Sequence, residues 1–318
     1  MSPIDGTVAE TGEFAMIKAV TEGRRQPPGT LLGPGDDAAV VAAPDGRVVA
    51  STDVLVQGVH FRLDWSSPEQ VGRKAVAVNL ADIVAMGAVP TTVLVGLACP
   101  SDTPASLVAE LVDGMWAEAV KAGIGVSGGD MVRADQLVIS ITALGDLGDR
   151  EPVTRAGARP GDVVAVCGRL GWAAAGLAVL GRGFRSPVGV VNAQRVPEPP
   201  YEAGRLAALA GATAMIDVSD GLLADLGHIG ASSGVGIDVR TADLDVPTRL
   251  VEVGAALGAD PVQWVLTGGE DHALAATFPP FTELPDGWRA IGVATMAESG
   301  ITVDGKPYSG NGGWTHWR

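Results

Sequence analysis

The feature that most constrains this chain is a series of short acidic turns, most of which place one or two carboxylates beside glycine or serine at the end of an apolar run. In chain order they are Gly35-Asp36-Asp37, Ser51-Thr52-Asp53, Asn79-Leu80-Ala81-Asp82, Gly128-Gly129-Asp130, Asp217-Val218-Ser219-Asp220-Gly221 and Gly268-Gly269-Glu270-Asp271. If the apolar runs are strands of one sheet, their ends meet at one edge, where α/β proteins bind ligands. The sequence therefore predicts that these acids gather there.

Carboxylates gathered in this way repel one another, so a cation is expected among them. Oxygen ligands without a Cys or His cluster favour Mg²⁺ or Ca²⁺ over zinc. In proteins Mg²⁺ is usually held by a few carboxylates together with nucleotide phosphates. The alternative for any one motif is that its acid only caps a helix or forms a turn. Asp220, which precedes the helix-like run LLADLGHI, is open to both interpretations.

Asp82 fits the capping interpretation least well. It stands inside a predicted helix in an Ala- and Val-rich stretch, where a carboxylate without a partner is costly. Asn79 precedes it by one turn and lies on the same helix face. A metal ion or a buried hydrogen-bond network would each account for the pair.

Strand-like and helix-like runs alternate along the 318 residues, a length that suits two domains. Pro44-Asp45-Gly46 joins two apolar runs and predicts a β-hairpin. Ser67, Pro68 and Gln70 predict a capped helix that runs on to Gly87, and a second helix is expected to start near Pro104. The Gly- and Pro-rich segment GDLGDREPVTRAGARPGD breaks the pattern. We expect an α/β or α+β fold with domains at 1–149 and 150–318.

The net charge of −15 excludes some partner classes. A surface this acidic repels nucleic acid and anionic lipid, so we expect neither as a partner. The two cysteines, Cys99 and Cys167, sit in apolar runs and suit buried free thiols in a reducing compartment. With no export signal evident at the N-terminus, the expected location is the cytoplasm.

Two well-known phosphate-binding signatures are missing from the sequence. It has no G-x-x-x-x-G-K-[ST] motif and no protein-kinase motif set. With all its acidic turns taken together, the chain instead resembles the thiamine-monophosphate kinase family. That family belongs to a group of ATP-binding proteins that includes aminoimidazole ribonucleotide synthetase, selenide water dikinase and a hydrogenase maturation protein. The resemblance begins at Gly12-Glu13-Phe14 and continues through GDDAAV, STDVLVQGVHF, KAVAVNLADIVAMGAVP, SGGD, TRAGARPGD, DVSDGLLADLGHI and GGEDHAL.

The resemblance implies ATP-dependent phosphorylation of thiamine monophosphate to thiamine diphosphate, the last step of thiamine diphosphate biosynthesis, with several Mg²⁺ ions. The implied metal ligands are Asp37, Ser51, Thr52, Asp53, Asp82, Asp130, Asp217 and Asp220. The implied ATP contacts are Gly129, Asp130, Arg155 and Ser219, with Asp53, Asp130 and Arg155 as catalytic residues. Thiamine phosphate would contact His60, Glu270 and a C-terminal tryptophan, for which we favour Trp314 over Trp317.

The family fold implied here is the two-domain aminoimidazole ribonucleotide synthetase-like fold, in which the N-terminal domain forms the interface of a homodimer. The chain departs from the family at GGEDHAL, where His272 and Ala273 replace the usual Tyr and Glu. Two other functions stay open. One is a sibling synthetase or dikinase, although the dikinase family carries a reactive N-terminal Cys or selenocysteine and this chain has no Cys before Cys99. The other is a non-catalytic sensor that binds ATP and Mg²⁺.

Phosphoryl transfer is achieved mainly by positioning and charge neutralisation. Because the acceptor is itself a phosphate, two anions have to approach each other, and bound Mg²⁺ would screen their repulsion. Arg155 would add a fixed positive charge beside the donor phosphates. We expect direct in-line transfer without a phosphoenzyme.

Overall fold

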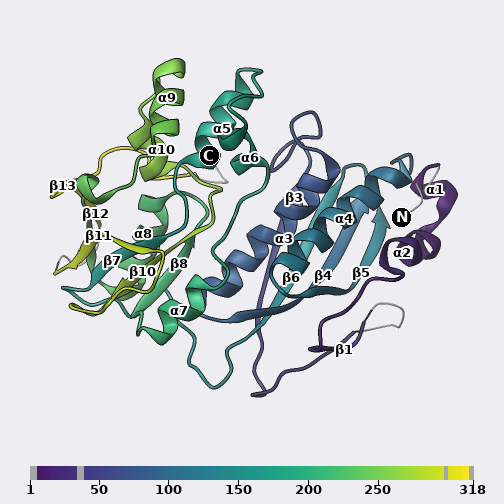
Figure 1. The fold of residues 1–318 in the computed structure, drawn as a ribbon, viewed down its shortest axis with the longest axis horizontal. Helices are drawn as coiled ribbons and strands as arrows, with labels where there is room; N and C mark the ends of the chain where they lie inside the picture. Colours follow the sequence, from purple (N-terminus) through teal and green to yellow (C-terminus); the bar gives the residue numbers. More distant parts are fainter. Residues whose placement is uncertain (1–5, 34–38, 297–299, 315–318) are drawn as a thin grey trace. The chain divides into compact units, whose positions relative to one another are not determined.

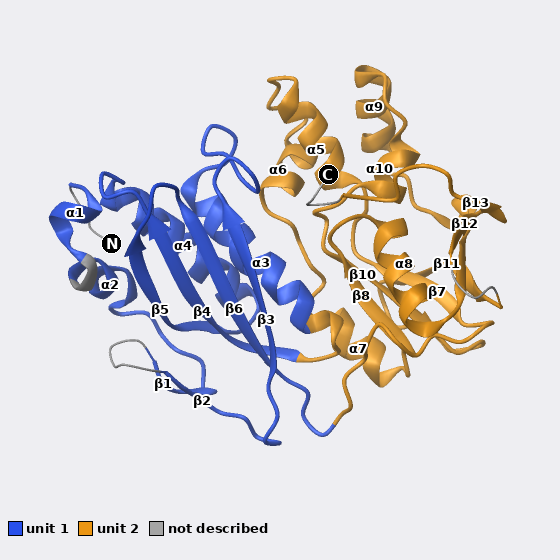
Figure 2. Ribbon diagram, turned by 180° about the vertical axis from the view of Figure 1, so that it is seen from behind, with its two compact units in different colours: residues 1–83, 89–149 blue, residues 84–88, 150–318 orange. Residues whose placement is uncertain are grey.

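The computed structural model describes residues 6–33, 39–296 and 300–314. The chain forms two compact units, residues 1–83 with 89–149 and residues 84–88 with 150–318 (Figure 2). Both units combine helices with a β-sheet, so the fold class is mixed α/β. No helix within the described ranges is long and apolar enough to cross a membrane.

The first unit is built on a four-stranded sheet with the order β3-β6-β4-β5. Its strands are β3 (Val49–Val56), β4 (Val89–Cys99), β5 (Gly125–Arg133) and β6 (Val138–Asp146), and its helices are α1 (Val8–Thr11), α2 (Glu13–Thr21), α3 (Pro68–Ala85) and α4 (Ala105–Lys121). The helices α3 and α4 lie against one face of the sheet (Figure 2). A small separate sheet pairs β1 (Thr30–Leu32) with β2 (Val40–Val41).

The predicted capped helix is confirmed. The backbone N–H of Gln70 donates to Oγ of Ser67 at 3.2 Å, and that of Ser67 donates to Oε1 of Gln70 at 3.0 Å. The predicted hairpin around Pro44-Asp45-Gly46 is wrong. Its first run, β2, pairs with β1, and its second run, β3, pairs with β6. The turn itself is present, but the two runs find partners elsewhere in the chain.

The second unit contains a seven-stranded sheet with the order β13-β12-β9-β11-β7-β10-β8. Its strands are β7 (Val163–Cys167), β8 (Ala214–Val218), β9 (Gly236–Val239), β10 (Ala273–Phe278), β11 (Trp288–Thr295), β12 (Ile301–Val303) and β13 (Lys306–Pro307). Its helices are α5 (Trp172–Gly181), α6 (Val188–Arg195), α7 (Ala203–Leu209), α8 (Leu222–Ser233), the 3₁₀ turn η1 (Thr241–Asp243), α9 (Thr248–Leu257) and α10 (Pro261–Thr267) (Figure 1).

The core of the second unit explains why residues 84–88 belong to it. Val84 and Ala85, at the end of α3, join a buried apolar cluster with Phe278 and Trp288. The rings of Phe278 and Trp288 meet edge to face with their centroids 5.4 Å apart, a favoured aromatic geometry. The end of α3 therefore contributes to a different core from its beginning.

The single-sheet expectation for the acidic turns is wrong. The turns are divided between two sheets, and most neighbouring strands are antiparallel. In addition, Asp53 and Asp130 stand inside β3 and β5, not beyond their ends. Strand ends therefore do not gather these acids at one edge, and each unit has its own set.

Candidate active site

In the first unit, β3 and α3 bring four of the polar residues together. Oγ of Ser51 donates to Oδ2 of Asp82 at 2.6 Å. The backbone N–H of Asp53 donates to Oδ1 of Asn79 at 2.8 Å, while the Asn79 amide donates to the carbonyl of Ala75 at 2.9 Å. Asn79 and Asp82 thus face the same strand, as their spacing predicted. The buried network accounts for Asn79, and the exposed Asp53 leaves room for a ligand beside it.

Thr52 and Asp130 point away from this group. Side chains alternate along a strand, so Thr52 lies on the face opposite Ser51 and Asp53, where its hydroxyl donates to the carbonyl of Ile141 at 2.9 Å. Asp130 is exposed and next to the buried Met131, which also places it on the face opposite the helices. It lies on β5, three strands from β3.

Gly129 has a structural reason to be glycine. A Cβ atom there would come within 2.1 Å of the carbonyl oxygen of Val95 on the neighbouring strand. A side chain would therefore push β4 and β5 apart. The glycine is accounted for by strand packing whether or not a ligand approaches it.

His60 lies in a turn directly after β3. Its Nδ1 accepts from the backbone N–H of Val56 at 3.0 Å, so in the neutral ring the proton is on Nε2. The buried Lys74 donates through Nζ to the carbonyl of His60 at 3.3 Å. Sequence reasoning passed over Lys74, although a lysine inside an apolar helix is a signal of a buried partner.

In the second unit, three segments converge on the turn after β8. The backbone N–H of Glu270 donates to the carbonyl of Ser219 at 2.8 Å, and that of Trp314 donates to the carbonyl of Asp220 at 2.9 Å. A Cβ on Gly313 would lie 2.6 Å from the same Asp220 oxygen, so the close approach needs glycine. The structure therefore brings together Ser219, Asp220, Glu270 and Trp314, all predicted from the sequence.

Asp225, on the first turn of α8, holds that turn in place. Its Oδ2 accepts from the backbone N–H groups of Asp220 and Gly221 at 3.1 and 3.0 Å. Asp220 itself is not the helix cap, since Gly221 occupies the N-cap position without a side-chain bond. Burial raises the pKa of Asp225 to about 7, and the nearby Asp217 and Asp220 add to the rise. The sequence offered no signal that separates Asp225 from an ordinary helix acid.

Asp271 anchors the segment that carries Glu270. Its Oδ2 accepts from the backbone N–H of Gly171, and its Oδ1 from that of Ala173 at 2.8 Å, both at the start of α5. Burial raises its pKa to about 7. Its neighbours Glu270 and His272 have φ angles of +69° and +52°, which non-glycine residues adopt rarely and mostly at functional sites. Asp271 thus ties two uncommon backbone conformations to a helix end.

Arg155 stands in a loop that Ser233 holds. The Ser233 hydroxyl accepts from the backbone N–H groups of Gly157 and Ala158 and donates to the carbonyl of Arg155, each at 3.1 Å. One donated and two accepted bonds use the full capacity of a hydroxyl. Arg155 itself is exposed. Ser233, at the end of α8, was not predicted, because a single serine has no sequence signature.

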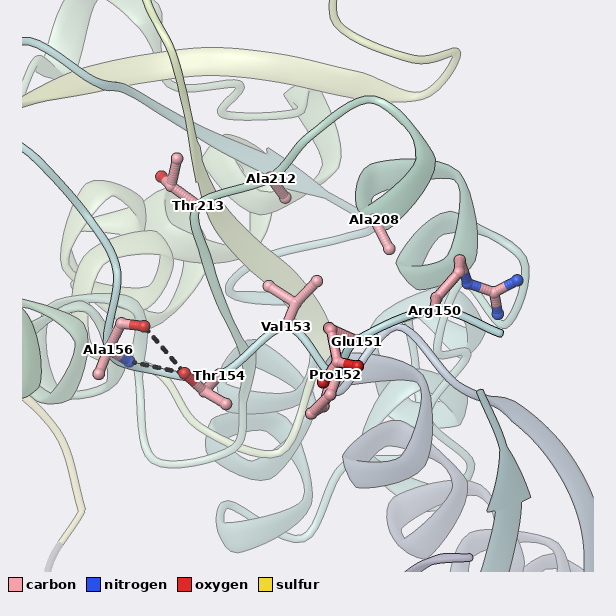
Figure 3. Close-up of a pocket in the computed structure, with 9 residues that line it drawn as sticks. All are labelled: Arg150, Glu151, Pro152, Val153, Thr154, Ala156, Ala208, Ala212 and Thr213. Carbon is pink, nitrogen blue, oxygen red and sulfur yellow. Dashed lines mark hydrogen bonds between the residues drawn. The ribbon is translucent and has the colours of Figure 1, made fainter. Parts of the chain in front are cut away.

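A cavity of about 370 Å³ lies beside the same loop (Figure 3). It is lined by Arg150, Glu151, Pro152, Val153, Thr154, Ala156, Ala208, Ala212 and Thr213. The Thr154 hydroxyl closes a tight turn by donating to the carbonyl of Ala156 at 2.9 Å and accepting from its N–H at 3.3 Å. Arg155 is the residue at the tip of this turn and does not line the cavity.

Two of the predicted residues, Asp37 and Trp317, lie outside the described residues. Within the described ranges, no three His, Cys, Asp or Glu side chains are gathered as a metal ion would need. The carboxylates fall instead into two candidate pairs. Asp53 and Asp82 lie on β3 and α3, which the bonds of Ser51 and Asn79 join, and Asp217 and Asp220 both lie near Asp225. Mg²⁺ is commonly held by one or two carboxylates together with substrate phosphates, and both pairs fit that kind of site.

Comparison with known proteins decides the family. Residues 35–147 match the AIR synthase related protein N-terminal domain, and residues 159–263 match the C-terminal domain. The thiamine-monophosphate kinase of Mycobacterium tuberculosis is 53% identical over 97% of this chain and 92% of that protein. The chain belongs to the thiamine-monophosphate kinase family. The resemblance inferred from the motifs is thereby confirmed.

Solved structures of this family have the same two-domain fold. AaThiL complexed with AMPPCP and TMP matches with a TM-score of 0.80 and 31% identity, covering 97% of this chain and 98% of that one. The thiamine-monophosphate kinase from Stenotrophomonas maltophilia matches with a TM-score of 0.80 and 32% identity, covering 92% and 95%. The predicted aminoimidazole ribonucleotide synthetase-like fold is confirmed.

Proposed function

We propose that this protein transfers the γ-phosphate of ATP to thiamine monophosphate and so produces thiamine diphosphate. The observation that carries the proposal is the 53% identity to a thiamine-monophosphate kinase over 97% of the chain. A relative of the same fold, AaThiL, has been solved complexed with AMPPCP and TMP. AMPPCP is an analogue of ATP. The segment that gathers Ser219, Asp220, Glu270 and Trp314 supports binding of both a nucleotide and an acceptor.

Magnesium is the cation we propose for this reaction. Asp53 and Asp82 in the first unit, and Asp217 and Asp220 in the second, offer hard oxygen donors. We propose that Asp37, Ser51, Thr52 and Asp130 serve it as well. When bound to ATP, Mg²⁺ neutralises charge on the phosphates.

For the nucleotide, we propose contacts from Ser219 and Arg155, which lie near opposite ends of α8. The helix has 12 residues, so its ends are about 17 Å apart at 1.5 Å per residue. Residues so far apart would contact different parts of an extended nucleotide. We therefore propose that Ser219 and Asp220 lie at its phosphates, while Arg155 contacts a part farther from them. This revises the expectation that Arg155 stands beside the donor phosphates.

For the acceptor, we propose His60, Glu270 and Trp314. Trp314 is 64% exposed, so its ring is available for stacking, while its backbone N–H is anchored on Asp220. A tryptophan face attracts a cationic heterocycle such as a thiazolium ring. The carboxylate of Glu270 is positioned on the adjacent segment. The protein then needs only to orient donor and acceptor, and we propose direct in-line transfer without a phosphoenzyme.

We also propose that the protein acts as a homodimer through the sheet of the first unit. Asp130 on β5 and Val54 on β3 belong to one row of the sheet, linked through Gly96 and Ser140. This row crosses three strand spacings of about 4.8 Å each, so β3 and β5 lie roughly 14 Å apart. That separation is too large for Asp130 and Asp53 of one copy to bind the same ion. A second copy would supply the missing carboxylate.

The open face of that sheet supports the same arrangement. Opposite the helices it carries Val54 and Val132, which are 49% and 52% exposed. No helix in the described part of the first unit lies across it (Figure 2). Burial of these exposed valines against a second copy of the sheet would be favourable. The N-terminal unit would then bind ATP and Mg²⁺ and would also form the dimer. The C-terminal unit would be the second domain. The buried thiols of Cys99 and Cys167 fit a cytoplasmic location.

The test is ADP release by the purified protein with MgATP, with and without thiamine monophosphate. We expect release that depends on thiamine monophosphate and stops when Mg²⁺ is chelated. ADP release that does not depend on thiamine monophosphate but requires another acceptor would favour a sibling enzyme with the same fold. Nucleotide binding without release under any of these conditions would favour a sensor.

A further inference from the structure

His272 and Asp217 form a buried side-chain contact. Nδ1 of His272 lies 3.0 Å from Oδ2 of Asp217, and the two residues are 5% and 4% exposed. They come from neighbouring strands, since Asp217 is near the end of β8 and β10 begins directly after His272. The backbone N–H of His272 donates to the carbonyl of Val218 at 2.9 Å. The sheet itself therefore holds the ring beside the carboxylate.

The backbone of His272 shows that this placement is specific. Its φ of +52° is uncommon for a residue with a side chain. The preceding Asp271 is fixed by two N–H groups at the start of α5. An uncommon conformation persists only where the surrounding structure determines it. The position of the imidazole is thus set from two sides, by β8 and by α5.

The contact has a chemical consequence for Asp217. When Nδ1 carries the ring proton, it donates to Oδ2 and restrains rotation of the carboxylate about its Cβ–Cγ bond. The direction of Oδ1 is then fixed as well. Carboxylates and histidines that bind metals are commonly oriented by such outer hydrogen bonds, whose loss weakens metal binding.

We propose that His272 is a positioning residue that orients the Asp217 carboxylate toward the cation of MgATP. This inference rests on the proposed function, which makes Asp217 a magnesium ligand.

The test compares His272→Ala, His272→Asn and Asp217→Asn, with His228→Ala as control for loss of a histidine at the exposed surface of α8. Mn²⁺ binding in the presence of AMPPCP is followed by electron paramagnetic resonance, which needs no turnover. The KM values for ATP and thiamine monophosphate and the thermal unfolding midpoint are measured beside it. The amide nitrogen of asparagine can stand where Nδ1 of histidine stands, so His272→Asn retains the donor.

We expect His272→Ala to weaken Mn²⁺ binding by about tenfold or more, with the KM for thiamine monophosphate unchanged. His272→Asn and His228→Ala should stay within about threefold of the original protein, because the donor is kept or was never involved. Unchanged Mn²⁺ binding in His272→Ala would refute the positioning role. Equal losses in the Ala and Asn variants would also refute it, since they would indicate packing alone.

Asp217→Asn separates this inference from the proposed function. If that variant binds Mn²⁺ as tightly as the original protein, the metal assignment of Asp217 is wrong and the inference falls with it. If Asp217→Asn loses Mn²⁺ while His272→Ala does not, the metal assignment holds and only the role of His272 is wrong.

Discussion

Oγ of Ser51 donates to Oδ2 of Asp82 at 2.6 Å, and this contact joins β3 to α3 beside the proposed magnesium ligands. We expect Asp82→Asn to lower kcat by about 100-fold or more, because it removes a charged ligand, and Ser51→Ala by about tenfold, because it frees the carboxylate to rotate. Steady-state assays over a range of Mg²⁺ concentrations measure both. Asp113→Asn, an exposed carboxylate on α4, is the control and should leave the rate unchanged. Full activity of the Asp82→Asn variant would show that Asp82 is not a ligand of the magnesium site.

The separation of Asp53 and Asp130 on opposite edge strands leads to a complementation experiment. Asp53→Asn and Asp130→Asn should each be inactive while the fold persists. If Asp130 serves the site of the partner copy, a mixed dimer of the two variants contains one intact site. Random reassembly should then recover about a quarter of the original activity. If mixed dimers form and no activity is recovered, Asp53 and Asp130 act in the active site of the same copy.

All three hydrogen bonds of the Ser233 hydroxyl go to backbone groups in the loop of Arg155. Ser233→Ala should raise the KM for ATP by roughly tenfold, as expected for the loss of one or two net hydrogen bonds that hold the loop. The KM for thiamine monophosphate should not change. The adjacent exposed Ser232→Ala is the matched control. Equal KM values for ATP in both variants would show that the loop does not need this anchor.

The raised pKa of Asp271, about 7 against an ordinary 3.8, predicts how stability depends on pH. Burial favours the neutral acid, so the folded state binds a proton more tightly than the unfolded state does. The contribution of Asp271 to stability is therefore fully present below about pH 4 and is lost as the pH rises through 7. Thermal unfolding between pH 5 and 8.5 should show this decline, and Asp271→Asn should reduce it. The same slope in both proteins would contradict the assignment.

Much of this account was accessible from the sequence, because some motifs carry their own chemistry. The capping box at Ser67 and Gln70 fixes the start of α3 locally, and the spacing of Asn79 and Asp82 fixes which face they share. The conjunction of acidic turns indicated the family. The first two signals lie within a few neighbouring residues, and each acidic turn is short although the set runs from residue 35 to residue 271.

What the sequence could not show are relationships between distant segments. The partner of β2 is β1 and not β3, which depends on tertiary pairing. Nothing local places Asp53 and Asp130 on opposite edges of a sheet, or assigns Val84 and Ala85 to the second core. Ser233, Asp225 and Lys74 act through hydrogen bonds to backbone groups of turns and loops, and such contacts leave no periodic pattern.

The most direct test of the central claim follows the γ-phosphate itself. The protein is incubated with Mg²⁺, γ-³²P-labelled ATP and thiamine monophosphate, and the products are separated by chromatography and the protein by denaturing electrophoresis. The account predicts label in thiamine diphosphate and none on the protein. Label that stays in ATP, or that appears on an aspartate or histidine of the protein before it reaches the product, would contradict it.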